Sequence, residues 1–161
     1  MSTRVGFYHL TRLPLDKALP RLLERACSAG HKVVVMAGSA ERVAHLDALL
    51  WTFDPAAWMP HGTAKDGDAA LQPIFLTDAD ANPNGADMLV LLDGVSPARL
   101  EGFKRCALMF DGNDGAAVEA ARSQWAAWKD RGLELTYHQQ TEQGGWEEKA
   151  SANRATGDHP S

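Results

Sequence analysis

The chain has few cysteines: Cys27 and Cys106 are the only two in its 161 residues. Two thiols cannot form a disulfide framework, and no C-x-x-C zinc spacing occurs. Such sparse cysteine usage is typical of proteins from a reducing compartment. The first residues lack the apolar run of a signal peptide, and no segment approaches the roughly 20 apolar residues that span a bilayer. We therefore expect a cytoplasmic protein that does not enter the membrane.

The sequence also lacks the motifs that hold phosphates or activate nucleophiles. Neither G-x-x-x-x-G-K-[ST] nor a G-x-G-x-x-G after an expected strand is present, and G-x-S-x-G is absent. The six histidines include no H-x-x-x-H or H-E-x-x-H pair. An enzyme hypothesis therefore has only a fold-level analogy to support it, and fold does not establish function. We expect neither a cofactor nor a metal.

Positive charge is in deficit as well. The chain carries 16 Lys and Arg against 21 Asp and Glu, a formal net charge of −5. Sequence-independent DNA binding depends mainly on neutralising phosphates, so this balance disfavours it. Net charge hides local distribution, however, and a basic patch is still compatible with it. The length and the hydrophobic fraction of 45% fit a single domain with a real core.

What is present is an alternation of strand and helix patterns. Short apolar runs predict strands, and apolar residues at helical spacing predict helices between them. This order favours an α/β fold: a mostly parallel sheet with helices on both faces, Rossmann-like but without a phosphate loop. We expect one domain over residues 1–138 and a polar, flexible tail over 139–161. The expected strands are 5–9, 31–37, 71–77, 88–93, 106–112 and 133–138; the expected helices are 15–27, 39–51, a short one opened by Pro97, and 116–131.

Aromatic residues gather in an unusual place after the second expected helix. That helix ends near Trp51, and a proline-containing segment follows it with no periodic core pattern. These side chains either fold back over the sheet edge or form an exposed apolar patch for a partner. His61 belongs to this group, and a structural or interface role is favoured for it over catalysis, because the sequence shows no partner acid or nucleophile beside it. The candidate partner-binding residues are Trp51, Phe53, Trp58, Met59 and His61.

A second candidate site lies on the last expected helix. Val118, Arg122, Trp125 and Lys129 are spaced i, i+4, i+7 and i+11, which places them along one stripe. A guanidinium beside an indole suits an acidic peptide with an apolar terminal residue, because arginine clamps a carboxylate and the ring supplies a hydrophobic wall. The alternative is a solvated helix face with one half-buried tryptophan.

Four segments of the sequence are familiar in this order and spacing: FYHL (7–10), LDALLW (46–51), WMPH (58–61) and AARSQWAAWKDRGLEL (120–135). Through them the sequence resembles the chi subunit family of bacterial DNA polymerase III over roughly residues 4–137. The resemblance implies a non-catalytic accessory subunit of the clamp loader, with a nucleotide-binding-like α/β fold. It also implies two partners: the acidic C-terminal tail of single-stranded DNA-binding protein (SSB) and the small subunit psi.

The resemblance also assigns roles to particular residues. Arg122 matches the tail-binding arginine of the family, and Trp125 matches an aromatic position of the same site. Trp51 and Trp58 match aromatic positions that face psi. Relatives have more lysines around the arginine, whereas here Val118 and Ala126 stand nearby, which leaves Arg122 and Lys129 on the stripe and Arg131 just beyond it. A weaker affinity for the SSB tail and a shallower salt dependence would follow.

Two other functions compete with this reading. One is a small-molecule or nucleotide-dependent enzyme with a degenerate Rossmann-like site. It predicts stabilisation by some nucleotide. The other is direct binding of single-stranded DNA, with Trp51 and Trp58 as stacking platforms. The acidic balance of the chain disfavours the second.

Overall fold

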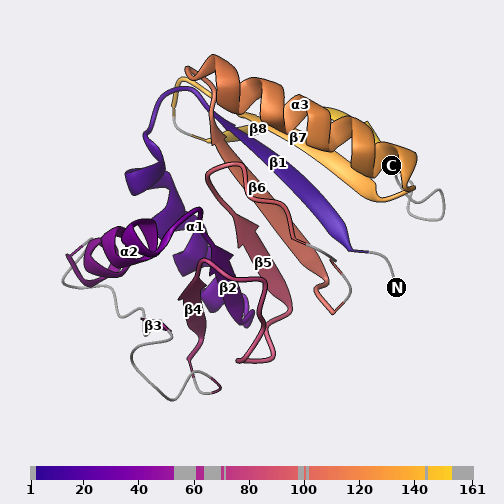
Figure 1. Cartoon of the computed structure of the whole chain (residues 1–161). Helices are drawn as coiled ribbons and strands as arrows, with labels where there is room; N and C mark the ends of the chain where they lie inside the picture. The colour runs from indigo at the N-terminus through magenta and orange to yellow at the C-terminus, as the bar shows by residue number, and fades with distance from the viewer. Residues whose placement is uncertain are drawn as a thin grey trace.

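A computed structural model describes residues 3–52, 61–63, 70, 72–97, 100, 102–143 and 145–153. Within these residues the chain alternates between strands and helices (Figure 1). No helix among them is both long and apolar enough to cross a membrane. The elements are β1 (Arg4–Leu10), α1 (Leu15–Ser28), β2 (Val33–Met36), α2 (Ala40–Thr52), β3 (His61–Thr63), β4 (Ile74–Thr77), β5 (Met88–Leu91), β6 (Arg105–Asp111), α3 (Gly115–Asp130), β7 (Glu134–Gln140) and β8 (Trp146–Ala152).

The strands form one sheet in the order β3-β4-β2-β5-β6-β1-β7-β8. All neighbours are parallel except β7 and β8, which pair antiparallel. In Figure 1, α1 and α2 lie beside the β2 and β4 end of the sheet, and α3 lies along β1 and β7. The expected α/β class with a mostly parallel sheet is therefore confirmed.

The sheet has a hydrophobic core on each face, because successive strand residues point to opposite sides. Val33 and Val35 of β2 pack in the core that contains Leu19 and Leu23 of α1. On the other face, Phe7 of β1 packs in the core that contains Ala121 and Trp128 of α3. Strands buried on both faces appear in the sequence as continuous apolar runs, which is why the central strands were predictable.

Local capping explains where the last helix begins and ends. The carboxylate of Asp114 accepts hydrogen bonds from the backbone N–H groups of Ala116 (3.0 Å) and Ala117 (3.4 Å). Two residues after α3, Gly132 has φ of +83°, a conformation that glycine adopts without strain. This cap starts α3 directly beside the carboxyl end of β6, so that α3 crosses back over the sheet.

Three expectations about the elements need correction. The predicted flexible tail is wrong as far as residue 153: β7 continues to Gln140, and Trp146–Ala152 forms the edge strand β8. Its sequence, WEEKASA, has no apolar alternation, because an exposed edge strand is held mainly by backbone pairing. Residues 154–161 lie outside the described part. The short strand β3 was not expected, and no helix forms at Pro97 in the residues described there.

Candidate protein-binding sites

The stripe predicted on the last helix exists, and its four residues divide into two kinds. Val118 and Trp125 are half-buried and pack against the core on the α3 face. Arg122 and Lys129 point outward, and the side chain of Arg122 is 73% exposed. The stripe therefore presents cations above an apolar base, which is the arrangement expected for a site that holds an anionic group and a ring together.

The apolar base extends beyond the helix into the sheet. The ring of Trp125 meets Phe7 edge-on at 5.2 Å and Tyr137 at 6.0 Å between centroids. The hydroxyl of Tyr137 is 2.5 Å from Nδ1 of His9, whose ring also lies against Phe110. These rings stand at the carboxyl ends of neighbouring strands. Arg122 therefore has an aromatic neighbourhood made by β1, β6 and β7 as well as by its own helix.

Electrostatic effects place the guanidinium of Arg122 near two of these rings. Burial lowers the pKa of His9, and the positive charge of Arg122 lowers it further, against the opposing effect of Asp111. Burial raises the pKa of Tyr137, and Arg122 partly offsets that rise. The carboxylate of Glu119 lies 3.5 Å from the guanidinium, but both side chains are more than 70% exposed. Such a surface pair is weak, so it competes little with an incoming anion.

Sequence reasoning missed three members of this site: His9, Phe110 and Tyr137. A signal was available, since each is two residues beyond a buried residue of the same strand face, at the period of a strand. Their convergence depends on which strands are neighbours, and the sequence does not show that order. The resemblance did include His9 within FYHL, but it assigned the residue no role.

The second predicted group is described only in part. Trp51 is the large hydrophobic residue most exposed in the described part of the chain, at 58%. Its ring lies 4.5 Å from that of His61, whose side chain is fully buried. Nε2 of His61 is 3.1 Å from a carboxylate oxygen of Asp47, so the histidine links β3 to α2 and supports the exposed indole. Phe53, Trp58 and Met59 lie outside the described residues.

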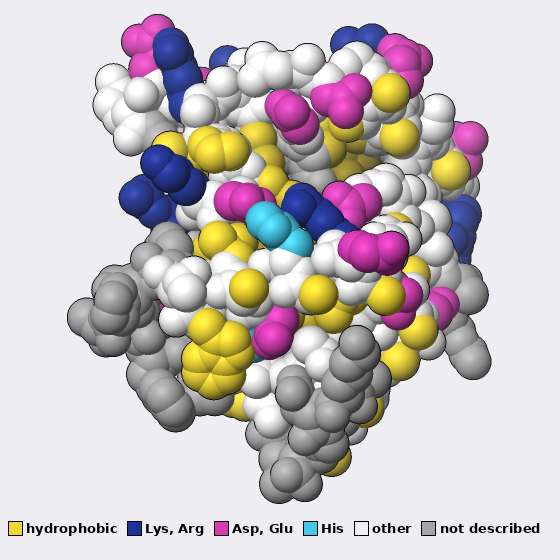
Figure 2. Space-filling view, turned by 60° about the vertical axis from the view of Figure 1, so that its left-hand side comes forward, with side chains coloured by type: hydrophobic (Ala, Val, Ile, Leu, Met, Phe, Trp, Pro, Cys, Tyr) yellow, Lys and Arg dark blue, Asp and Glu magenta, His cyan; other side chains and the backbone are white. Residues whose placement is uncertain are grey.

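The face that carries α1 and α2 has no broad apolar area among its described residues. Figure 2 shows hydrophobic side chains there scattered between acidic and basic ones. Ion pairs join Asp16 of α1 to His45 (2.8 Å) and Arg42 (3.9 Å) of α2. These pairs hold the two helices together, and the indole of Trp51 stands exposed beside them at the end of α2.

The carboxyl edge of the sheet is where α/β domains commonly hold ligands. A cavity of about 390 Å³ lies there, lined in part by Asp93, Asp111 and Asp114. The carboxylate of Asp93 accepts a hydrogen bond from the N–H of Gly38 (3.0 Å) and from Nε of Arg42 (3.2 Å). These carboxylates serve as structural links, and the two arginines of the same lining, Arg12 and Arg42, are paired with Glu142 and Asp93. The geometry therefore gives no support to a nucleotide at this edge.

The described residues likewise offer little for metal or thiol chemistry. No group of three or more His, Cys, Asp or Glu side chains among them could hold a metal ion. Burial raises the pKa of Cys27 and, more strongly, that of the fully buried Cys106. Thiols with raised pKa values are poor nucleophiles, because the thiolate is the reactive form.

Fold and site together define an α/β domain whose exposed chemistry is a guanidinium beside aromatic rings, with no phosphate loop in its sequence. Residues 1–136 match the family described as "DNA polymerase III chi subunit, HolC". The chain therefore belongs to the DNA polymerase III chi subunit family, a family of DNA replication.

Two relatives illustrate the match. The "Probable DNA polymerase III subunit chi" of Rickettsia prowazekii is 31% identical over 105 residues, which is 65% of this chain and 64% of that protein. The "DNA polymerase III subunit chi" of Pseudomonas aeruginosa is 28% identical over 139 residues, or 84% of this chain and 96% of that protein. The chain thus spans just under two thirds of the first relative and nearly all of the second.

Proposed function

We propose that this protein is a non-catalytic docking subunit of the DNA polymerase III holoenzyme. In this role it links the clamp loader, through psi, to the acidic C-terminal tail of SSB. The observation that carries the proposal is the exposed guanidinium of Arg122 above the half-buried ring of Trp125. Family membership supplies the replication context, and the geometry of α3 supplies a chemically suitable site.

The proposed tail complex uses the two kinds of residue on the α3 stripe. Arg122 holds a carboxylate of the peptide through paired N–H donors, and Trp125 with Tyr137 contacts its apolar terminal side chain. Lys129, two turns along the helix, attracts the acidic residues that precede the terminus. Because Val118 brings no charge to the stripe, only two cations act there. The affinity should therefore depend on salt less steeply than in a lysine-rich site.

The proposed psi contact centres on Trp51. An indole that is 58% exposed and supported from below by His61 is a suitable hydrophobic anchor. It is carried by α2, whereas the tail site is on α3 across the sheet. Two separate surfaces would allow both partners to bind at once, as a linking subunit requires.

The tail site is tested by fluorescence anisotropy with a labelled peptide of the SSB C-terminus. Arg122→Ala should weaken binding about 10- to 100-fold, the effect of losing a charged hydrogen-bonded pair of about 1.5–3 kcal/mol. Arg122→Lys should bind at an intermediate level, since lysine cannot make the paired contact. Arg131→Ala, an exposed arginine at the end of the same helix, is the matched control and should bind as the wild type does. Unchanged affinity in Arg122→Ala would reject this site.

The psi contact is tested separately by co-purification of the chain with psi. Trp51→Ala should lose psi and keep the tail peptide, while Arg122→Ala should do the opposite. A Trp51→Ala variant that retains psi at wild-type yield would exclude this anchor. The crossed design separates a local loss from general unfolding, because each variant is expected to keep one partner.

A further inference from the structure

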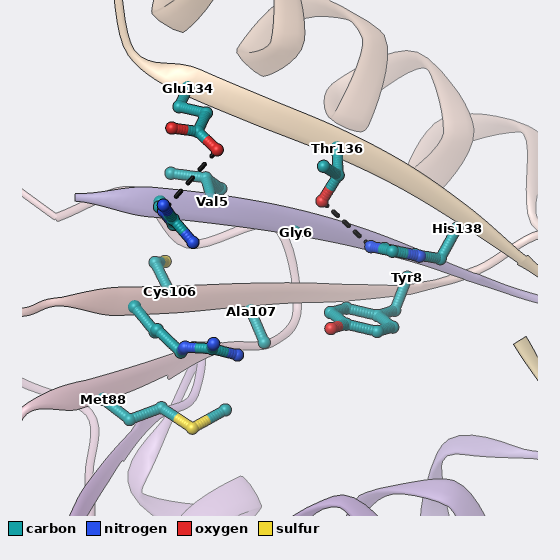
Figure 3. Close-up of a pocket in the computed structure, with 11 residues that line it drawn as sticks. Val5, Gly6, Tyr8, Met88, Cys106, Ala107, Glu134, Thr136 and His138 are labelled. Atoms are coloured by element: carbon teal, nitrogen blue, oxygen red, sulfur yellow. Dashed lines mark hydrogen bonds and ion pairs between the residues drawn. The ribbon is translucent and has the colours of Figure 1, made fainter. Parts of the chain in front are cut away.

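The sheet face opposite α3 carries a second concave surface (Figure 3). A cavity of about 430 Å³ lies over β1, β6 and β7, with Tyr8, His138 and Arg105 among its lining residues. A neighbouring hollow of about 410 Å³ shares these three residues and adds Arg25 of α1 and Trp146 of β8. The two hollows form one depression between α1 and β8, which we call the sheet groove.

The floor of the sheet groove is aromatic. Tyr8 and His138 project from partner positions on β1 and β7, and their rings stack with centroids 4.8 Å apart at 15°. Trp146 meets Tyr8 edge-on at 5.1 Å. A Cβ on Gly6 would lie 2.8 Å from the Tyr8 ring, so glycine there lets the ring lie back along the strand. The hydroxyl of Thr136 is 2.9 Å from Nε2 of His138 and holds that ring in place.

The groove also carries two guanidinium groups, although the chain as a whole is acidic. Arg25 and Arg105 are exposed, and in the described part of the chain no carboxylate forms an ion pair with either. Burial raises the pKa of Tyr8, while both guanidinium groups act to lower it, so they lie near its hydroxyl. The carboxylate of Glu134, which lines the groove, is paired with Arg4 at 3.5 Å. His31, which also lines it, is paired with Asp87 at 2.7 Å, and Glu148 stands opposite His138 on β8.

We propose that the sheet groove binds single-stranded nucleic acid. Phosphates would lie at Arg25 and Arg105, and unstacked bases would lie against the Tyr8, His138 and Trp146 rings. Unpaired guanidinium groups beside aromatic rings are the combination that sequence-tolerant single-strand sites use. A duplex keeps its bases stacked and could not reach a recessed aromatic floor. An acidic peptide would pair with the arginines, but it would not account for the stacked rings beside them.

This site is separate from the one proposed on α3. The α3 site faces the opposite side of β1 and β7, since Phe7 and Tyr137 alternate with Tyr8 and His138 along the same strands. The chain could therefore hold an acidic peptide on one face and a nucleic acid strand on the other. The size of the groove, which falls within the range of about 300–1,000 Å³ typical of ligand sites, suits one or two nucleotides.

The number of arginines sets the expected salt dependence. Each phosphate neutralised on a single strand contributes a slope of about −0.7 to log K against log salt, so the two contacts at Arg25 and Arg105 give about −1.4. Affinity should then fall about 25-fold between 20 and 200 mM salt. A strongly basic protein would show a much steeper loss.

The test is an anisotropy titration of fluorescein-labelled dT12 with the full chain at both salt concentrations. Saturable binding with this slope is expected, and Arg25→Ala combined with Arg105→Ala should abolish it. The matched control removes two exposed arginines elsewhere, Arg12→Ala with Arg131→Ala, and should leave binding within about twofold. Absence of binding at 20 mM salt would overturn the proposal. So would equal losses in the two double variants, because net charge alone would then explain the binding.

Competition binding experiments decide whether the groove holds single-stranded nucleic acid or another ligand. A duplex or the mononucleotide dTMP that binds as tightly as dT12 would overturn the proposal. The labelled tail peptide is then added to an Arg122→Ala variant, in which the α3 site is disabled. If the peptide displaces dT12 there, the groove is a peptide site and the proposal fails. If dT12 stays bound, and Tyr8→Leu weakens it about 5- to 150-fold at an unchanged salt slope, the stacking role is supported.

Discussion

The two faces of β1, β6 and β7 differ in what covers them. On one face α3 closes over the strands, and Phe7, Trp128 and Leu135 are almost fully buried beneath it. On the other face α1 flanks the strands, and among the described residues no helix covers the rings of Tyr8 and His138. The same three strands therefore supply a sealed core on one side and an open depression on the other.

This difference separates the proposed binding from stability on the α3 face and couples the two on the open face. The cations of the α3 stripe stand on the outer side of a helix, where Arg122 can be replaced without disturbing the core. In the sheet groove, Tyr8 and Trp146 also pack against the core on that face. Substitutions at these rings should alter stability and binding together, whereas the exposed Arg25 and Arg105 should alter binding alone.

The largest expected effect tests whether the covered face is the main core. Trp128→Ala removes an indole that is 2% exposed and lies against Phe7, and should cost about 3–5 kcal/mol in free energy of unfolding. Trp146→Ala removes a half-buried indole from the open face and should cost about half as much. Urea denaturation followed by far-UV circular dichroism measures both. Equal costs would show that the open face is as important to the core as the covered one.

A smaller loss is expected from Gln140, which holds the loop after β1 from the carboxyl end of β7. Its side-chain oxygen accepts N–H hydrogen bonds from Arg12 and Leu13, both at 2.8 Å, and from Thr11 at 3.3 Å. Gln140→Ala should cost about 1–3 kcal/mol, because it leaves partly buried donors without an acceptor. Gln139→Ala, the adjacent substitution, is the control in the same urea experiment. A cost no larger than that of the control would show that water can replace Gln140 as the acceptor for the backbone N–H groups of this loop.

Gln140 also shows why the sequence located the domain boundary wrongly. Its environment is a loop 127–129 positions away, and nothing local marks it as buried. The central strands were predictable because continuous apolar runs are typical of strands buried on both faces. The polar edge strand β8 was not, since its place depends on pairing with β7 and on the contact of Trp146 with Tyr8. Local pattern thus identified the centre of the sheet and missed its edge.

The candidate sites were likewise predictable only where local sequence pattern determines their geometry. The α3 stripe was predictable because a single helix brings Arg122 and Trp125 together at fixed spacing. The rings of His9 and Tyr137 complete the site from strands 128 positions apart. The sheet groove could not be predicted at all, because its residues come from β1, α1, β6, β7 and β8. Their convergence depends on the strand order, which the sequence does not reveal.

A modest pH dependence of stability is expected from Asp87, which precedes β5 and pairs with His31. Burial alone would raise its pKa, but the hydrogen bonds from His31 and from the N–H of Lys32 outweigh burial, so the pKa lies below its usual value. The unfolded chain then binds more protons, and this contribution to stability is present above about pH 3.9 and lost as pH falls through the folded pKa. Asp87→Asn should therefore lower the free energy of unfolding at pH 7 and make little difference near pH 2. In a His31→Gln background the same substitution should cost less; an equal cost would exclude the pair as its cause.

The smallest expected effect is a change in the pKa of His9, which NMR spectroscopy can detect. The pKa of His9 should lie below about 6.5 in the wild-type chain, because burial and the charge of Arg122 disfavour the imidazolium. Arg122→Ala should raise it, and a tail peptide bound at Arg122 should raise it too, since its carboxylate offsets the positive charge. NMR titration of the histidine side chains measures this, with Arg131→Ala as the control that leaves His9 unchanged.

His138 provides the matching reporter on the open face. In the same spectra, dT12 should shift the resonances of His138 and leave His9 in place, while the tail peptide should do the reverse. Because the two histidines stand on neighbouring strands and point to opposite sides of the sheet, this pattern requires two separate sites. If either ligand shifts both histidines equally, the faces are coupled through the strands, and the separation of functions proposed for them fails.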